Sequence, residues 1–444
     1  MKHIYKPSYL FQDDCFKQGK GVLVEDGSIR AVEEAEKLVA QHPDAMIADW
    51  TNLALVPGTV NAHNHSFQSL LRGLVTDRPF LEWRDKALYH YSPRFTTQDL
   101  YTGALFAFGE MLRYGATTVC DFFYLHNDGS ESDEAIIQAA KDVGIRLVLA
   151  RTMYDWNGAP KGYQESVEQA VTHTKKLALK YAGNPMVKIL PAPHSLHAAS
   201  LEMVKAGHDL ALELGTKFHI HVAEEPFEVE ETTKAYGLAP VELLDKIGVL
   251  DENMVAIHAV WLKDNEIKLM GEHKAGLVYC PSSNMFLADG VTKVVELMKA
   301  GVTVGLGSDG ACSNNRISVF EEMRMTALLQ KVSLLNATAI SSKQVFDMGT
   351  ANAEQLLGIP VGKIAPGYHA DFVGIDTKDL SMQPIYDVNE QMMPNIVYAM
   401  QPNAIAKVVV QGIEQVHNGH IVSMPEDKIY QTLQVLIQKF NFLS

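Results

Sequence analysis

The chain has 444 residues, 47% of them hydrophobic and 20% charged, a composition typical of one large globular domain with a smaller companion. Its formal net charge of -15 at pH 7 argues against nucleic acid as a partner, because phosphate binding needs a basic surface. Four scattered cysteines without a CxxC pair argue against a disulfide framework and predict a reducing, cytoplasmic location.

The sequence predicts no membrane partner. The opening "MKHIYKPSYLFQDD" has no apolar core of signal-peptide length before its acidic residues. No uninterrupted apolar run reaches the roughly 18 residues that a membrane span requires. We therefore expect a protein that acts on a small molecule, without membrane or nucleic acid.

Residues 1–56 begin with a strand–turn–strand pattern. The segment "GVLVEDGSIRAV" places Asp26 and Gly27 at the turn between two apolar runs, as in a tight hairpin. Residues 364–425 have the same character, with "IAPGYHADFVGID" and "AKVVVQGIEQVHNGHIV". We expect both segments to pair into one small β-sandwich domain. Residues 426–444 then end the chain as a C-terminal helix.

Residues 57–363 predict alternating strands and helices. Helix-like segments such as "TTQDLYTGALFAFGEMLRYG" and "SLEMVKAGHDLALELG" end in glycine, as helix C-termini prefer. Near-continuous apolar runs between helices are typical of buried parallel strands. Eight such runs fit an α/β fold of the (β/α)₈ TIM-barrel type. They lie at 53–65, 116–124, 145–152, 187–195, 217–225, 254–261, 276–284 and 302–310.

Polar side chains gather at the ends of these runs, where the active sites of such barrels lie. The first run ends in His63 and His65, which share one face because they are two residues apart on a strand. Alone, this pair can be two ordinary polar residues. Further strand ends carry His194, His219, His221, Glu224, His258 and Asp309.

Together these residues predict a catalytic site for one divalent metal ion. Three histidines and a carboxylate with room for water are typical of such a site, and His63, His65, His221 and Asp309 can supply them. The metal would lower the pKa of its water toward about 7, and Asp309 would take the proton. His258 would orient the hydroxide, and Glu224 would protonate a nitrogen of the substrate. His219 lies one layer deeper, so we expect a structural role.

One competing motif is weak. "GLGSDG" at 305–310 matches the GxGxxG dinucleotide fingerprint, but "ACSNNRIS" delays the next helix and no βαβ unit follows. The glycines there more readily let the backbone bend around Asp309. Cys312 has no evident base partner, and we expect it to be structural.

Several motifs resemble the amidohydrolase superfamily, and within it the cytosine/adenosine/guanine-type aminohydrolases. They are "PGTVNAHNH", "HIHVAEE", "HAVWL", "CPSSNMFLADGV", "GSDGACSNN" and "GKIAPGYHADFV". The resemblance implies a barrel capped by a β-sandwich, a dimer or larger homo-oligomer, and a single Zn²⁺ or Fe²⁺ on the four ligands named above. It also implies Glu224 and His258 as the catalytic pair. Binuclear relatives carry a lysine where this chain reads "PAPHS", so His194 is expected to contact substrate.

The substrate is less sharply predicted. The second half resembles S-adenosylhomocysteine/methylthioadenosine deaminases, whereas "HNHSFQ", "EWRD" and "FFYLH" resemble formimidoylglutamate deiminases and imply contacts from Gln68, Arg84 and Tyr124. Arg84 is equally compatible with a salt bridge on the rim. His197 stands where the deiminases carry a carboxylate-binding arginine, and "ALYHYSP" lacks the ribose-binding glutamate of adenosine-type enzymes.

We therefore predict a metal-dependent hydrolytic deaminase that acts on a C=N carbon of a small N-heterocycle, a purine or purine-nucleoside derivative, and releases ammonia. The alternatives are a formimidoylglutamate-like deiminase and a triazine-type (chloro)hydrolase on the same scaffold. A non-catalytic scaffold is a more remote alternative, because such proteins usually lose the metal ligands that this chain keeps.

Overall fold

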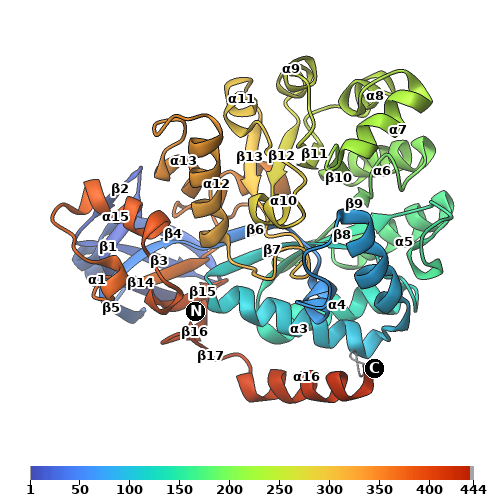
Figure 1. Ribbon diagram of the computed structural model, residues 1–444. Helices are drawn as coiled ribbons and strands as arrows, with labels where there is room; N and C mark the ends of the chain where they lie inside the picture. Colours follow the sequence, from blue (N-terminus) through green and yellow to red (C-terminus); the bar gives the residue numbers. More distant parts are fainter. Residues whose placement is uncertain (1, 441–444) are drawn as a thin grey trace.

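The structure, a computed structural model, describes residues 2–440 and has an α/β architecture (Figure 1). Its centre contains two four-stranded parallel sheets. The first sheet is formed by β6 (Thr59–Asn64), β7 (Ala116–Phe123), β8 (Arg146–Met153) and β9 (Val187–Pro193). The second is formed by β10 (Phe218–Val222), β11 (Met254–His258), β12 (Gly276–Tyr279) and β13 (Thr303–Leu306).

The outer strands of the two sheets lie against each other on both sides. An isolated parallel bridge pairs Ser195, just beyond β9, with His221 of β10. On the other side, the Asp309 amide donates to the His63 carbonyl over 3.1 Å. The Asn61 side chain accepts a hydrogen bond from the Ser308 amide over 3.0 Å, which ties β6 to the end of β13. Both edges of each sheet are therefore covered by the other sheet.

The predicted strand runs correspond to these eight strands, with one difference. The continuous run 53–65 is divided between β5 (Met46–Pro57), which belongs to the terminal sheet, and β6. Gly58 stands at the division, where a Cβ atom would lie 2.2 Å from Oγ1 of Thr117. Only glycine permits this close approach of the two segments.

Helices follow the parallel strands and cover the outside of both sheets (Figure 1). Their ends are specified locally: α3 begins with a capping box between Thr96 and Asp99, and α4 and α6 end at Gly144 and Gly215 in left-handed conformations. The helices are α3 (Thr97–Arg113), α4 (Ser130–Val143), α5 (Val167–Lys180), α6 (Leu201–Leu214), α7 (Pro226–Tyr236), α8 (Pro240–Lys246), α9 (Asp264–Glu272), α10 (Pro281–Phe286), α11 (Val294–Lys299), α12 (Val319–Ser333), α13 (Ser342–Met348) and α14 (Ala353–Leu357).

Both ends of the chain meet in one nine-stranded sheet. The antiparallel pair β14 (Phe372–Asp376) and β5 joins the C-terminal strands to the N-terminal ones. The remaining strands are β1 (Lys2–Gln12), β2 (Cys15–Lys17), β3 (Lys20–Glu25), β4 (Ser28–Glu34), β15 (Ile405–Val410), β16 (Ile413–His417) and β17 (His420–Ile421). The helices α1 (Ala35–Gln41) and α15 (Val388–Tyr398) accompany this sheet.

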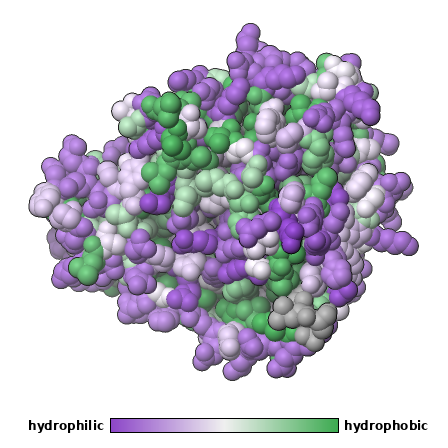
Figure 2. Space-filling view, viewed as in Figure 1, coloured by the Kyte–Doolittle hydropathy of each residue, from purple (hydrophilic) through white to green (hydrophobic). Residues whose placement is uncertain are grey.

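The C-terminal helix α16 (Glu426–Phe440) packs along α3, at the bottom of Figure 1. Residues 441–444 of the predicted terminal helix, and Met1 of the predicted sandwich, lie outside the described residues. Within residues 2–440, no helix is both long and apolar enough to cross a membrane. Hydrophilic side chains surround most of the face drawn in Figure 2, with hydrophobic ones gathered in patches between them.

Candidate metal centre and pocket

The four predicted metal ligands converge where β6, β10 and β13 end. His65 Nε2 lies 3.3 Å and His63 Nε2 lies 3.5 Å from Oδ1 of Asp309. His221 Nε2 lies 3.3 Å from His63 Nε2. All four residues are at most 5% exposed. The structure therefore places three imidazoles and one carboxylate around a common centre.

Burial favours the neutral form of all three histidines, and two of them present a lone pair to this centre. Burial lowers the pKa of His63 to about 3, and it also lowers those of His65 and His221. Nδ1 of His65 lies 2.6 Å from the Phe122 carbonyl, and Nδ1 of His221 lies 3.0 Å from the His194 carbonyl. Because a carbonyl only accepts, each Nδ1 carries the hydrogen and each Nε2 keeps its lone pair. Converging neutral Nε2 atoms fit a bound cation.

Asp309 completes the set as a carboxylate. Burial alone would raise its pKa, but its close contacts with the His63 and His65 rings hold that pKa well below its usual range. Ser283 Oγ donates to Oδ2 over 2.6 Å, and Ser313 Oγ does so over 3.1 Å. These donors leave Oδ1 facing the histidines, so three nitrogens and one carboxylate oxygen are available as ligands.

Glu224 and His258 stand beside this set. Glu224 Oε1 lies 3.3 Å from His258 Nε2, and atoms of Glu224, His258 and Asp309 lie within 4.8 Å of one another. Burial raises the pKa of Glu224 well above its ordinary value, and the charges of Asp289 and Asp309 raise it further. Burial lowers the pKa of His258. Glu224 can therefore hold a proton at neutral pH and give it to a bound molecule.

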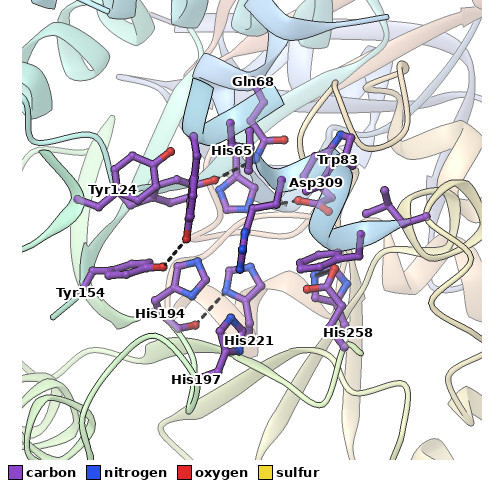
Figure 3. A pocket seen from close by; sticks show the side chains of 17 residues that line it. His65, Gln68, Trp83, Tyr124, Tyr154, His194, His197, His221, His258 and Asp309 are labelled. Carbon is purple, nitrogen blue, oxygen red and sulfur yellow. Dashed lines mark hydrogen bonds and ion pairs between the residues drawn. The ribbon is translucent and has the colours of Figure 1, made fainter. Parts of the chain in front are cut away.

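A cavity of about 590 Å³, including its mouth, opens above these residues. Figure 3 shows Tyr124, Tyr154 and His194 on one side of it and Trp83 and His258 on the other. The cavity wall also includes Gln68, Arg84 and His197.

The four predicted substrate contacts all line this cavity. Gln68 Nε2 donates to the Tyr124 hydroxyl over 3.1 Å, and the ring of His194 stacks at 4.8 Å on that of His221. Arg84 pairs with Asp85 at 2.8 Å, and it lines the cavity with its guanidinium over the Tyr89 ring.

Several residues that line the cavity were not predicted from the sequence. They are Phe80, Trp83, Leu88, Tyr89, Tyr154, Tyr163 and Leu287. Tyr154 directly follows β8, so its strand-end position was a usable signal, as it was for the histidines. The others lie on connecting segments and carry no catalytic signature.

Two residues expected to be structural lie outside the cavity wall. His219 is fully buried, with Nε2 3.2 Å from the Leu356 carbonyl and Nδ1 3.8 Å from the Cys120 sulfur. Cys312 is buried behind Gln68, and its carbonyl accepts a hydrogen bond from the Trp83 indole over 2.9 Å.

Comparisons with known proteins agree with these motifs. The amidohydrolase family model matches residues 54–421. A 5-methylthioadenosine/S-adenosylhomocysteine deaminase from Pyrococcus furiosus is 32% identical over 419 residues, which cover 94% of this chain and 95% of that protein. A 5'-deoxyadenosine deaminase from Methanothermobacter thermautotrophicus is 36% identical over 366 residues, which cover 82% of each chain. An adenosine deaminase from Xanthomonas campestris, solved with bound zinc, has a TM-score of 0.90 at 25% identity and covers 99% of this chain and 98% of its own. The resemblance inferred from the motifs is confirmed, and the chain belongs to the amidohydrolase family.

Proposed function

We propose that this protein is a metal-dependent hydrolytic deaminase of a purine-nucleoside derivative, which replaces an amino group on a C=N carbon by oxygen and releases ammonia. The observation that carries the proposal is the convergence of three histidine nitrogens and the Asp309 carboxylate beside Glu224, whose pKa burial raises well above its usual range. The names of the related nucleoside deaminases support this substrate class.

The ligand set fits one divalent ion, with Zn²⁺ favoured and Fe²⁺ as the alternative. His63, His65, His221 and Asp309 would hold it. The zinc in the Xanthomonas structure supports this choice. When bound, such an ion lowers the pKa of water toward neutrality, so that hydroxide is available as a nucleophile.

The other residues then handle protons. Asp309 takes the proton of the attacking water, while His258 directs the nucleophile with its Nε2–H. Glu224 protonates the ring nitrogen next to the reacting carbon, which makes that carbon a better acceptor. The new C–O bond forms as the C=N bond opens. The amino group then takes up the proton from Asp309, the new hydroxyl group returns a proton to Glu224 as the C=O bond forms, the C–N bond breaks, and ammonia leaves.

The wall of the cavity would bind the substrate through Gln68, Tyr124 and His194, with Arg84 at the rim. Arg84 is the one lysine or arginine among the lining residues that the structure describes. A formimidoylglutamate-like substrate carries two carboxylates beside its formimino group, and a single cation is a weak match for them. This observation favours the nucleoside over the deiminase alternative.

We also propose the finer architecture. The contacts on both edges of the two parallel sheets support a closed (β/α)₈ barrel over residues 57–363. A β-sandwich over 1–56 and 364–425 is supported by contacts between the ends of the terminal sheet. The Ala370 amide donates to the Gly27 carbonyl over 2.9 Å, and the Gly412 amide donates to the Ala370 carbonyl over 2.8 Å. Assembly into a dimer or larger homo-oligomer and a cytoplasmic location remain part of this proposal.

Ammonia release from metal-loaded protein tests the function. The panel contains adenosine, 5'-deoxyadenosine, 5-methylthioadenosine, S-adenosylhomocysteine, free purines, pterins, pyrimidines, formimidoylglutamate and an aminotriazine. We expect turnover of at least one adenine nucleoside and none by the Glu224→Gln variant. Turnover confined to formimidoylglutamate or the triazine would refute the nucleoside assignment. If protein with a full metal complement released no ammonia from any compound of the panel, the deaminase proposal would be refuted.

A further inference from the structure

A carboxyl group that does not line the cavity stands directly behind His258. Asp289 is 1% exposed and follows α10 by three residues. Its Oδ2 lies 3.0 Å from Nδ2 of Asn284, and the same Nδ2 lies 3.2 Å from Nδ1 of His258. One side-chain amide therefore connects Asp289 to a ring that faces Glu224.

The hydrogen-bond inventory of this chain fixes the state of His258. The Asn284 amide nitrogen has two hydrogens, and it has one neighbour for each: Asp289 Oδ2 and His258 Nδ1. His258 Nδ1 must then be an acceptor, so the ring carries its hydrogen on Nε2, 3.3 Å from Glu224 Oε1. If the Asn284 amide were flipped, its oxygen would face His258 and require the hydrogen on Nδ1. Because Asp289 Oδ2 accepts hydrogen bonds, it favours the orientation in which the Asn284 nitrogen faces both Asp289 and His258.

The position of Asp289 is fixed by its own backbone. Its amide donates to the Asn284 carbonyl over 2.9 Å, and its carbonyl accepts from the Trp261 indole over 2.8 Å. The preceding Ala288 has a φ of 63°, a left-handed conformation that costs free energy in a residue other than glycine. This strained turn points the Asp289 side chain back toward α10.

A second acid, Glu225, shares a hydrogen bond with Asp289. Burial raises the pKa of Asp289 to about 9, with a further contribution from this bond, and burial also raises the pKa of Glu225. Asp289 Oδ1 is buried, and no amide, hydroxyl or cationic donor among residues 2–440 reaches it. A proton held between the two carboxyl groups satisfies this atom and leaves Oδ2 free to accept from Asn284.

We propose that Asp289 is a positioning residue for the deamination, which acts through the Asn284 amide to hold His258 as the Nε2–H tautomer facing Glu224. The inference rests on the proposed function, because His258 directs the nucleophile there. Neither Asp289 nor Glu225 touches the substrate. Asp289 and Glu225 together orient His258, which lies next to the reacting atoms.

The test compares Asp289→Ala with Asp289→Asn. The alanine variant removes the acceptor, whereas an asparagine oxygen can still accept from Asn284 while its NH₂ donates to Glu225. We expect Asp289→Ala to lower kcat by about 10-fold or more with KM changed less than about threefold. We expect Asp289→Asn to keep kcat within about threefold of the wild type. The matched control is Asp264→Asn, because the Asp264 side chain is 94% exposed and pairs with Lys293 at the surface.

A spectroscopic readout separates orientation from general damage. In protein with ¹⁵N-labelled histidine rings, the nitrogen shifts report which ring nitrogen carries the hydrogen, and His258→Asn identifies the His258 signals. We expect the Nε2–H tautomer in the wild type and in Asp289→Asn, and a shift toward Nδ1–H in Asp289→Ala. Metal content and the far-ultraviolet circular dichroism of each variant establish that it is folded.

Three results would overturn the inference: Asp289→Ala with kcat within twofold of the wild type, Asp289→Asn as impaired as Asp289→Ala, or a loss of kcat in Asp289→Ala without any change in the His258 tautomer. Failure of the proposed function looks different. In that case the wild type releases no ammonia from nucleosides, while the tautomer comparison still decides whether Asp289 acts on His258.

Discussion

Replacing Glu224 by glutamine should remove catalysis while leaving the metal in place. Glutamine has the size and shape of glutamate, and its Oε1 can still accept from His258 Nε2–H at the 3.3 Å position. It cannot give up a proton to a ring nitrogen. Because Glu224 is not among the four converging ligands, the metal content per chain should be unchanged.

The size of the loss follows from the surroundings of Glu224. A positioned acid–base group is worth about 10²- to 10⁴-fold in rate, or roughly 2.7 to 5.5 kcal/mol in the activation free energy. The other acid that lines the cavity, Asp309, has a lowered pKa and is ionised, so it cannot donate in place of Glu224. We therefore expect the upper part of this range, a loss of about 10³-fold or more in kcat.

The pH profile gives a second test of the same role. Burial and the charge of Asp289 raise the pKa of Glu224, so its proton-donating form persists at neutral pH and is lost as pH rises through that pKa. The wild-type kcat should fall on the alkaline side, and the residual rate of Glu224→Gln should lack this limb. Stopped assays of ammonia release across pH 6 to about 10 measure both.

The control is Glu231→Gln, which removes the same charge from an exposed position on α7 and should leave kcat unchanged. Two outcomes would refute the reasoning. One is a Glu224→Gln variant within tenfold of the wild type, which would mean that another group supplies the proton. The other is loss of metal from that variant, which would place Glu224 among the ligands.

Other parts of the structure lead to further predictions. His221→Ala should lose both bound metal and activity, and a full metal complement by elemental analysis would show that the ligand set is wrong. Glu322 is fully buried with its pKa raised to about 8, so wild-type stability should fall as pH rises from about 4.5 through about 8, by up to roughly 5 kcal/mol. Glu322→Gln should gain stability relative to the wild type over that range in urea titrations, and a constant difference would contradict this. Arg151 is fully buried and pairs at 2.8 Å with Asp133 and Glu165, so Arg151→Ala should cost about 3–5 kcal/mol in urea unfolding, because these two buried carboxylates would keep only their contacts with histidines. A loss below 1 kcal/mol would show that water or a proton replaces the arginine at little cost.

The α/β fold was predictable because buried parallel strands form continuous apolar runs. Every residue of β7 and β8 is buried, and apolar side chains occupy both faces of these strands, with Asp121, Arg146 and Arg151 as buried exceptions. The same continuity concealed the division at Gly58, since β5 and β6 are apolar on both sides of it. What separates them is the approach of Thr117, a residue almost 60 positions later, which no local pattern reports.

The candidate site was predictable where chemistry and position coincide. Imidazoles and carboxylates at the ends of parallel strands lie close together, so the candidate set could be named from residue type and strand-end position together. Trp83 and Tyr163 line the same cavity but lie on connecting segments, where an aromatic residue is as readily packed in a core. The pairing of Asp289 with Glu225 depends on how the turn after α10 folds back, and sequence distance gives no sign of it.

The backbone conformation at the strand ends explains why the sequence identifies these residues but does not show where their side chains point. Ala223, His258 and Asp309 follow or end β10, β11 and β13 with φ values of 50°, 68° and 58°. Each left-handed residue of this kind costs on the order of 1–3 kcal/mol, and glycine would avoid most of that cost. Glycine would also remove the imidazole or the carboxylate at two of the three positions. The buried strands hold the backbone at their ends in this conformation. This backbone then directs the side chains of Glu224, His258 and Asp309 toward one centre. The identity of a catalytic side chain is therefore local information, whereas its orientation belongs to the folded strands that impose the strain.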